Sequence, residues 1–167
     1  MKKLIMWLLL VLFGVSVNAG DCASLMDLPP FERAVLIIKY YESLHRPEHW
    51  PTIGYSHVVQ SGESYKRGEQ LTGRQADALL RKDLKKFCAM YRSFGADSLL
   101  LACVSYNCGP VKIIGGQGYV KSRLLRKLES GNRNILSDYL SFCHYQGKLH
   151  QGIRRRRWVE YKMLFKR

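Results

Sequence analysis

Glu42 stands at the end of a predicted helix whose apolar stripe leads directly to it. Phe31, Ala34 and Ile38 recur at helical spacing, and Glu42 follows Ile38 by four residues on the same face. This spacing directs the carboxyl group toward the protein interior. Burial and the negative end of the helix dipole both disfavour the charged form, so we expect a raised pKa and a proton held near neutral pH. Such a side chain is suited to general acid catalysis.

A polar segment follows ten residues later. The run Thr-Ile-Gly-Tyr-Ser-His at residues 52–57 is typical of a strand entering a glycine turn, and it would present polar groups opposite Glu42. An acid that faces a polar strand indicates a catalytic cleft. The alternative is a glutamate at a fraying helix end, whose methylene stem lies on apolar surface while its carboxylate reaches water.

The elements that must position this pair are mostly helical. Thr72 and Gln75 form a capping box that opens a helix, and Asp97 or Ser98 caps an apolar run at residues 99–106 that ends at Gly109 and should be the core helix. Further helices are expected at residues 119–129, 135–142 and 153–165, with one hairpin at 52–60 as the only β region. We therefore predict an α+β fold, mostly α, with a small hairpin lobe packed on a helical lobe.

The first residues predict export. Lys2 and Lys3 precede an apolar run, and Ala19 ends a Val-Asn-Ala sequence that a signal peptidase accepts. We expect a signal peptide at residues 1–19, an N-terminal extension at 20–30 and one domain at 31–167, located in the periplasm or outside the cell. An uncleaved membrane anchor is the alternative, and the residues before Cys22 do not favour lipid attachment.

The charge balance predicts an anionic partner. The chain carries a net charge of +14, and removal of Lys2 and Lys3 leaves +12. An exported protein meets peptidoglycan carboxylates and anionic membrane lipids more often than nucleic acid, which we do not expect as a partner. The densest basic run is 154–157, interpreted as a solvated helix face in which one or two arginines pair with carboxylates at the core edge.

The cysteines give little evidence for a metal or redox site. The chain has five cysteines after the signal peptide, and no two have the C-x-x-C spacing of a metal or redox pair. An odd number leaves at least one thiol free, and the sequence does not define a disulfide pairing. We expect neither a metal nor another cofactor, and nothing in the pattern requires more than a monomer.

Several motifs, in order, resemble those of the phage-type (T4-like) lysozymes. These are Glu42, the run at 52–57, Gln-Ala-Asp-Ala-Leu-Leu-Arg-Lys-Asp-Leu at 75–84, Asn-Cys-Gly at 107–109, Ser-Arg-Leu-Leu at 122–125, and Gly152 with Ile153, Arg156, Arg157 and Glu160. The resemblance extends over about residues 31–165. It implies a lysozyme-like fold and hydrolysis of the β-1,4 bond after N-acetylmuramic acid in peptidoglycan.

Transferred position by position, the resemblance implies roles for several residues. Glu42 becomes the general acid, and Thr52 provides the hydroxyl that helps to place the attacking water. His57 occupies the position of the histidine that ends the family's Thr-Ile-Gly-Tyr-Gly-His, where it is expected to brace the cleft rather than exchange protons. Tyr55 and Asn107 lie in two of the matching motifs, and together with His57 they are expected to line the substrate site.

The chain departs from the family between Glu42 and Thr52. The family places an Asp there, on a hairpin about five residues longer, and this chain has none. An inverting glycosidase needs a base on the far side of the sugar, with the two carboxyl groups about 6.5–9.5 Å apart. Glu48 is the only acidic residue in the gap and is the candidate base. Ser56 replaces the family's second glycine, which should cost backbone freedom without affecting the chemistry.

Three other residues of this gap remain open in role. His45 and His49 are weaker candidates for the base, because neutral imidazole can assist a water molecule but cannot stabilise positive charge that develops on the sugar ring. Trp50 could stack on a sugar face or fill the edge of the core.

The sequence thus predicts a secreted, inverting muramidase with bacteriolytic or antimicrobial action. The first rival is a weak or inactive lysozyme fold that binds peptidoglycan for a conjugation or secretion apparatus, which would explain the missing Asp. The second is a basic nucleic-acid-binding protein, which rests on net charge alone and lacks a helix-turn-helix or zinc pattern.

Overall fold

The computed structural model describes residues 24–166, so the predicted signal peptide and Cys22 lie outside the described residues. The α-helices are α2 (Pro30–Glu42), α3 (Gly73–Met90), α4 (Ser98–Cys108), α5 (Val111–Ile114), α6 (Arg123–Glu129), α7 (Leu136–Leu140) and α8 (Gln151–Leu164). Short 3-10 helices are η1 (Leu25–Asp27), η2 (Pro47–His49) and η3 (Arg92–Asp97). The strands are β1 (Thr52–Ile53), β2 (His57–Val58), β3 (His144–Tyr145) and β4 (Lys148–Leu149).

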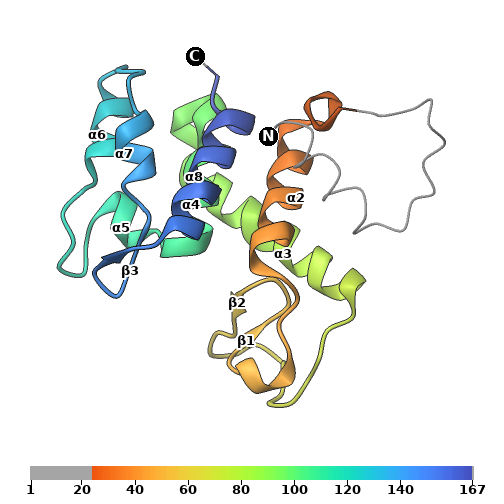
Figure 1. Cartoon of the computed structure of the whole chain (residues 1–167). Helices are drawn as coiled ribbons and strands as arrows, with labels where there is room; N and C mark the ends of the chain where they lie inside the picture. Colours follow the sequence, from red (N-terminus) through yellow and green to blue (C-terminus); the bar gives the residue numbers. More distant parts are fainter. Residues whose placement is uncertain (1–23, 167) are drawn as a thin grey trace.

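The elements form two lobes, as predicted. Helices α2, α4 and α8 pack together in the helical lobe, while the β1–β2 hairpin and η2 lie beyond the C-terminal end of α2, against α3 (Figure 1). The hairpin is antiparallel, with Thr52 opposite Val58 and Ile53 opposite His57. The α+β, mostly helical fold class is confirmed.

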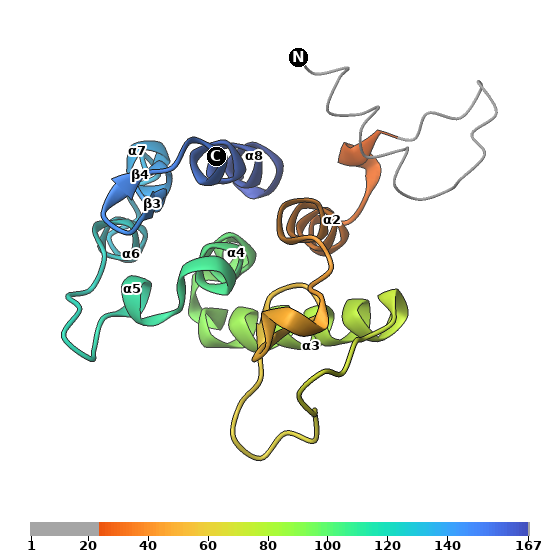
Figure 2. The same cartoon turned by 60° about the horizontal axis from the view of Figure 1, so that its bottom comes forward.

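Two apolar clusters hold the lobes. The larger is built on α4, whose Leu100, Leu101, Ala102, Cys103 and Val104 are all fully buried. Figure 2 views α2, α4 and α8 nearly end on, with α3 crossing beside them. The smaller cluster joins Ile53 of the hairpin to Leu71, Ala76 and Leu79. Because the same helix α3 contributes to both clusters, it fixes the hairpin relative to the helical lobe.

The helix ends largely follow their sequence signals. The Thr72 side chain accepts from the Gln75 backbone and the Gln75 side chain accepts from the Thr72 backbone, so the predicted capping box is confirmed. Asp97 occupies the N-cap position of α4, but its carboxylate makes no capping bond. It pairs instead with Arg133, whose Nη2 lies 2.9 Å from Oδ1. Of the two expected caps, Asp97 is confirmed as the N-cap residue, but its side chain does not cap the helix because Arg133 binds the carboxylate.

The helix predicted at residues 119–129 begins later than expected. Ser122 is its N-cap and accepts from the Leu125 backbone at 3.1 Å, so α6 starts at Arg123. The residues before it form an ordered turn in which Gly115 has φ +92°. A Cβ at that position would lie 2.8 Å from the Lys121 backbone nitrogen. The glycine is therefore required by both its dihedral angle and the close approach of the chain.

The expectation of a single β region is also wrong. Strands β3 and β4 form a second antiparallel hairpin, joined by Gln146 and Gly147, which both have positive φ. Positive φ at both central residues is the signature of a type I′ turn. Gln-Gly is a weaker form of the usual Asn-Gly signal, and the strands span only two residues each, so the sequence pattern was easy to miss.

Within residues 24–166, no helix has the length and apolar character needed to cross a membrane. The four cysteines of this part of the chain, Cys88, Cys103, Cys108 and Cys143, are free thiols.

Candidate active site

Glu42 is the last residue of α2 and lies where three other segments meet. Ser56 of the hairpin donates its hydroxyl to Oε2 at 2.5 Å, and Asn107 of α4 donates Nδ2 to Oε1 at 3.2 Å. Arg156 of α8 forms an ion pair with Oε1. Only 13% of the Glu42 side chain is exposed. The prediction that this carboxyl group points inward is confirmed.

The prediction that the Glu42 pKa is raised is wrong for the free protein. Burial is the largest single influence on this pKa and raises it, as expected. The Arg156 charge and the hydrogen bonds from Ser56, Arg156 and Asn107 act in the opposite direction, and together they lower the pKa below its usual value. Burial and the helix end are visible in the local sequence, whereas Arg156 comes from the other end of the chain.

A buried network holds Arg156 in place. Glu160 is fully buried and accepts from Arg156 Nε at 2.8 Å, from Arg157 Nη1 at 2.6 Å and from the Tyr139 hydroxyl at 2.7 Å. Arg156 therefore bridges Glu160 and Glu42. Arg156 and Arg157 both pair with Glu160, whereas Arg154 and its neighbour at 155 are exposed. The prediction that one or two arginines of this run pair with carboxylates at the core edge is therefore confirmed.

Asn107 is oriented from the same helix. Arg157 donates to Asn107 Oδ1, which leaves the Asn107 amide nitrogen directed toward Glu42. The two neighbouring arginines of α8 thus define both the charge next to Glu42 and the direction of its amide donor. The sequence placed Asn107 near the site through its motif, and the structure brings it into direct contact with Glu42.

His57 braces the hairpin on α3. Its Nδ1 lies 2.6 Å from Asp83 Oδ2 and its Nε2 lies 2.8 Å from Glu63 Oε2, and the residue is only 8% exposed. The hydrogen bond to Asp83 is the largest cause of a raised His57 pKa, supported by Glu63 and opposed by burial. Both ring nitrogens are occupied by carboxylates. These contacts support the interpretation that His57 braces the hairpin, and a contact of His57 with substrate stays a prediction.

Thr52 and Tyr55 belong to the same hairpin as Ser56. Thr52 is half-buried on β1, and within residues 24–166 its hydroxyl has no hydrogen-bond partner, so it is free to bind water. The Tyr55 carbonyl accepts from the Tyr106 hydroxyl of α4, which ties the turn to the core helix. The Tyr55 ring packs at the border of both apolar clusters, with the Lys39 ammonium 5.3 Å from its centroid.

The shortened segment before Thr52 folds as η2. Glu48 lies on it with 62% of its side chain exposed, and its charged partner is Arg46 at 3.9 Å. The structure does not bring Glu48 into contact with Glu42. Trp50 is the C-cap residue of η2 and packs against the cluster around Ile53. It therefore fills the edge of the core, which is one of the two roles expected for it.

Ser56 and His45 lie closer to Glu42 than their places in the sequence indicate. The Ser56 hydroxyl contacts both Glu42 Oε2 and His45 Nε2, the latter at 2.9 Å. The replacement of the family's glycine by Ser56 therefore does more than restrict the backbone, because its side chain hydrogen-bonds to the candidate acid. A usable signal was present: a residue with a side chain stands where the family has glycine, in a turn that requires positive φ.

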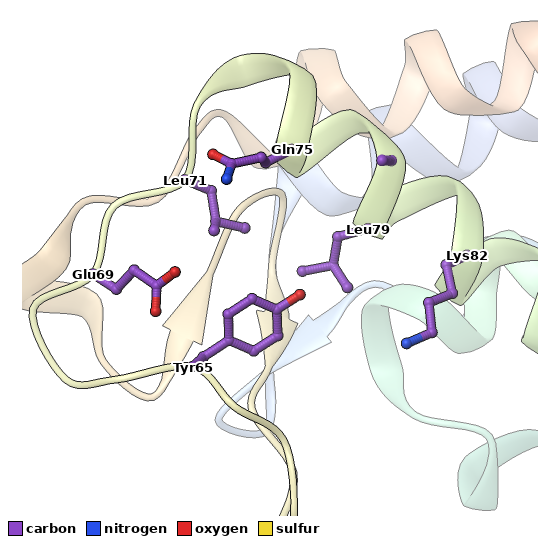
Figure 3. Close-up of a pocket in the computed structure, with 7 residues that line it drawn as sticks. Tyr65, Glu69, Leu71, Gln75, Leu79 and Lys82 are labelled. Atoms are coloured by element: carbon purple, nitrogen blue, oxygen red, sulfur yellow. The ribbon is translucent and has the colours of Figure 1, made fainter.

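A surface hollow lies elsewhere. Figure 3 shows it on the outer side of α3, where Tyr65 lies beneath Leu71 and Leu79, with Glu69 and Lys82 at its rim. None of these residues contacts Glu42. Within residues 24–166, no group of three or more histidine, cysteine or acidic residues could hold a metal ion. The convergence of polar groups at Glu42 therefore defines the candidate site better than the hollow does.

Comparison with known proteins agrees with this fold. The profile of the phage lysozyme family matches residues 39–160, and the chain belongs to that family. Its fold is similar to the endolysin from Escherichia coli O157:H7 phage FAHEc1, with a TM-score of 0.62 and 22% identity over 80% of this chain and 90% of that one. It is also similar to the muramidase domain of SpmX from Asticaccaulis excentricus, with a TM-score of 0.64 and 22% identity over 80% of this chain and 95% of that one. No curated protein sequence matches.

Proposed function

We propose that this protein is an exported muramidase that hydrolyses the β-1,4 bond between N-acetylmuramic acid and N-acetylglucosamine in peptidoglycan. Membership of the phage lysozyme family supports the substrate class. The observation that carries the proposal is the position of Glu42, a largely buried carboxyl group at the meeting point of α2, α4, α8 and the hairpin. Glu42 is the general acid that protonates the departing sugar oxygen.

Substrate binding should raise the pKa of Glu42 and so favour the protonated carboxyl group, which the free protein disfavours. Burial already raises the Glu42 pKa and is its largest single influence. A glycan chain laid over the site removes further water from the carboxyl group, which raises the pKa again. Arg156 keeps the carboxylate ionised and ordered until that moment. We therefore expect activity to be greatest on the acid side of neutrality.

The attacking water requires a second group. We assign this role to Thr52 of the hairpin, whose hydroxyl has no hydrogen-bond partner within residues 24–166 and could hold a water molecule. Glu48 is proposed as the general base of an inverting reaction, since its loop lies between Glu42 and Thr52 in the chain and no other acidic residue does. Proton NMR of the fresh reducing ends distinguishes the outcomes: α-anomers indicate inversion, and β-anomers contradict it.

Glu42→Gln tests the acid. This variant keeps the side-chain volume and a hydrogen-bonding oxygen, so it should fold and still sediment with insoluble peptidoglycan. It should release reducing ends from purified peptidoglycan at least about a hundredfold more slowly than the wild type, because it cannot donate a carboxylic acid proton. Glu129→Gln, at an exposed ion pair with Lys121, is the matched control and should retain the wild-type rate. Full activity of Glu42→Gln would refute the assignment.

Glu48→Gln tests the base separately. The residue is exposed and makes one long ion pair, so its replacement should leave folding and wall binding unchanged. A fall in turnover supports Glu48 as the base. An unaltered rate would assign the water to Thr52 without a second carboxylate.

Export and wall binding are part of the proposal. The N-terminal sequence is that of a signal peptide, and the basic mature chain suits the carboxylates of peptidoglycan stems and anionic membrane surfaces. N-terminal sequencing of the protein recovered from the periplasm or medium should begin at Gly20. Size-exclusion chromatography should give a monomer.

A second candidate function has one specific observation in its favour. The family's Asp is missing, and its proposed replacement, Glu48, is mostly exposed and pairs with Arg46. A lysozyme fold that binds peptidoglycan without cutting it, as part of a conjugation or secretion apparatus, would retain the rest of the site. Sedimentation with insoluble peptidoglycan without release of reducing ends would favour this function over hydrolysis.

A further inference from the structure

The Ser56 hydroxyl lies between the candidate acid and a histidine. Its Oγ is 2.5 Å from Glu42 Oε2 and 2.9 Å from His45 Nε2. Ser56 holds this position with φ +69°, in the left-handed region that a residue with a side chain seldom occupies. Backbone strain of this kind collects at functional sites. A glycine would satisfy the turn without strain, so the hydroxyl itself is the distinctive feature of this position.

His45 is held for this contact. Its backbone nitrogen donates to the Gly54 carbonyl at 2.8 Å, which fixes the residue against the hairpin turn. Its Nδ1 is buried and has no hydrogen-bond partner within residues 24–166, so Nε2 makes the defined contact of the ring. The His49 ring meets it edge-on at 4.9 Å. Burial is the largest cause of a lowered His45 pKa, followed by the His49 charge, with Glu42 opposing them.

The geometry excludes His45 as the base of an inverting reaction with Glu42. Two hydrogen bonds of 2.5 and 2.9 Å that meet at one oxygen cannot separate their outer atoms by the about 6.5 Å that such a pair requires. His45 is therefore on the same side as the acid. Its influence reaches the reaction through Ser56 and Glu42.

We propose that Ser56 and His45 are positioning residues that form a proton relay to Glu42 and restore its acid form after each turnover. This inference rests on the proposed muramidase function. Protonated His45 transfers the Nε2 proton to Ser56 Oγ as the Ser56 hydroxyl proton moves to Glu42 Oε2. The step leaves neutral imidazole, an intact serine hydroxyl and a carboxylic acid. The attacking water loses one proton to the solvent during hydrolysis, and His45 takes one proton back from the solvent, so the proton count of the cycle is balanced.

Both ends of this transfer are hydrogen-bonded. Before it, His45 donates to Ser56 and Ser56 donates to the Glu42 carboxylate. After it, the Glu42 acid donates to Ser56 and Ser56 donates to His45 Nε2. The other groups that face Glu42, Arg156 and Asn107, donate hydrogen bonds and therefore favour only its ionised form. The Ser56 hydroxyl can either donate or accept, so its hydrogen bond also accommodates the protonated form of Glu42.

Ser56→Gly and His45→Gln test the relay on the mature chain with purified peptidoglycan. Ser56→Gly removes the hydroxyl and relieves the positive-φ strain, so it should fold at least as well as the wild type. Each variant should lower kcat by about tenfold or more, within the range of a lost proton-transfer contribution, with KM changed less than about twofold. His144→Gln, at an exposed histidine on β3, is the matched control.

The pH profile separates a relay from a purely structural role. In the wild type, kcat should fall as pH rises through the pKa of His45, because the proton donor is lost. Outside the relay, Arg156 acts on the pKa of Glu42 and His49 acts on the pKa of His45, and Tyr106 is a further titratable group near Glu42. This fall of kcat with rising pH should be absent in both relay variants and present in His144→Gln.

The outcomes distinguish the two proposals. Unaltered kcat and pH profile in Ser56→Gly, with an active wild type, overturn the relay and leave the proposed function intact. A wild-type chain that releases no reducing ends overturns the proposed function. Loss of the His45-dependent step in both relay variants supports the relay.

Discussion

Replacement of Glu160 should be severely destabilising, because the residue is fully buried between two arginines. Glu160→Gln keeps the shape of the side chain but removes the charge that two buried arginines share. Arg156 is only 4% exposed and Arg157 is fully buried, so neither can turn to water. The groups around Glu160 all donate hydrogen bonds to it, so the new amide N–H of Gln would face another donor and find no acceptor.

Loss of one partner of a buried ion pair costs about 3–5 kcal/mol, because the remaining charge stays buried without compensation. Arg156 keeps Glu42 as a second partner, whereas Arg157 keeps only the amide oxygen of Asn107. We therefore expect about 3–5 kcal/mol of lost unfolding free energy. This is a large part of the about 5–15 kcal/mol that a domain of this kind has in total.

Urea unfolding followed by circular dichroism measures the effect. The midpoint of Glu160→Gln should fall by more than about 1 M, since ordinary urea m-values are about 1–3 kcal/mol per M. Glu129→Gln makes the same chemical change at a surface ion pair, where 40% of the carboxylate side chain is exposed, and should cost about 0–1 kcal/mol. A Glu160→Gln cost no larger than that of Glu129→Gln would refute the interpretation of this network as a buried, charge-balanced unit.

Three further predictions concern stability. The raised pKa of His57 means that its interactions stabilise the fold fully below the unfolded pKa of about 6.5, and that this contribution is lost as pH rises through the folded pKa. The stability difference between wild type and His57→Gln, measured by urea unfolding from pH 5.5 to 8.5, should therefore shrink with rising pH, and a constant difference would contradict it. Leu84→Ala, at a fully buried position, should cost about 2–5 kcal/mol in the same assay. Gly115→Ala should lower the thermal midpoint more than Gly118→Ala: both have positive φ, but only Gly115 meets the Lys121 backbone; equal effects would rule out the contact.

The fold was largely predictable because its signals are local. The capping box at Thr72 and the all-apolar run around Leu101 define α3 and α4 directly. Predictions failed where a local pattern had competing solutions. The segment after Gly115 could have continued a helix, but glycines in positive φ and the Ser122 cap delay it. The second hairpin was too short to show alternation, and its Gln146-Gly147 turn is a weak signal.

The sequence predicted which residues meet at the candidate site better than it predicted the charges around them. Glu42 and Asn107 are in contact, as their motifs suggested, and Trp50 fills the core edge. The role of His57 follows from two carboxylates that lie 6 and 26 residues away in the chain, which no spacing argument identified. Glu48 remains a proposal supported by its place in the sequence.

The sequence by itself determined the helices, the position of Glu42 at the end of one of them, and its inward direction, because helical periodicity and capping depend on neighbours within a few residues. Only the tertiary structure decided the charge state of that carboxyl group. Its pKa reflects Arg156, 114 residues away, and a serine hydroxyl shared with His45. Electrostatic energy depends on distance through space, and packing of α8 against α2 sets that distance.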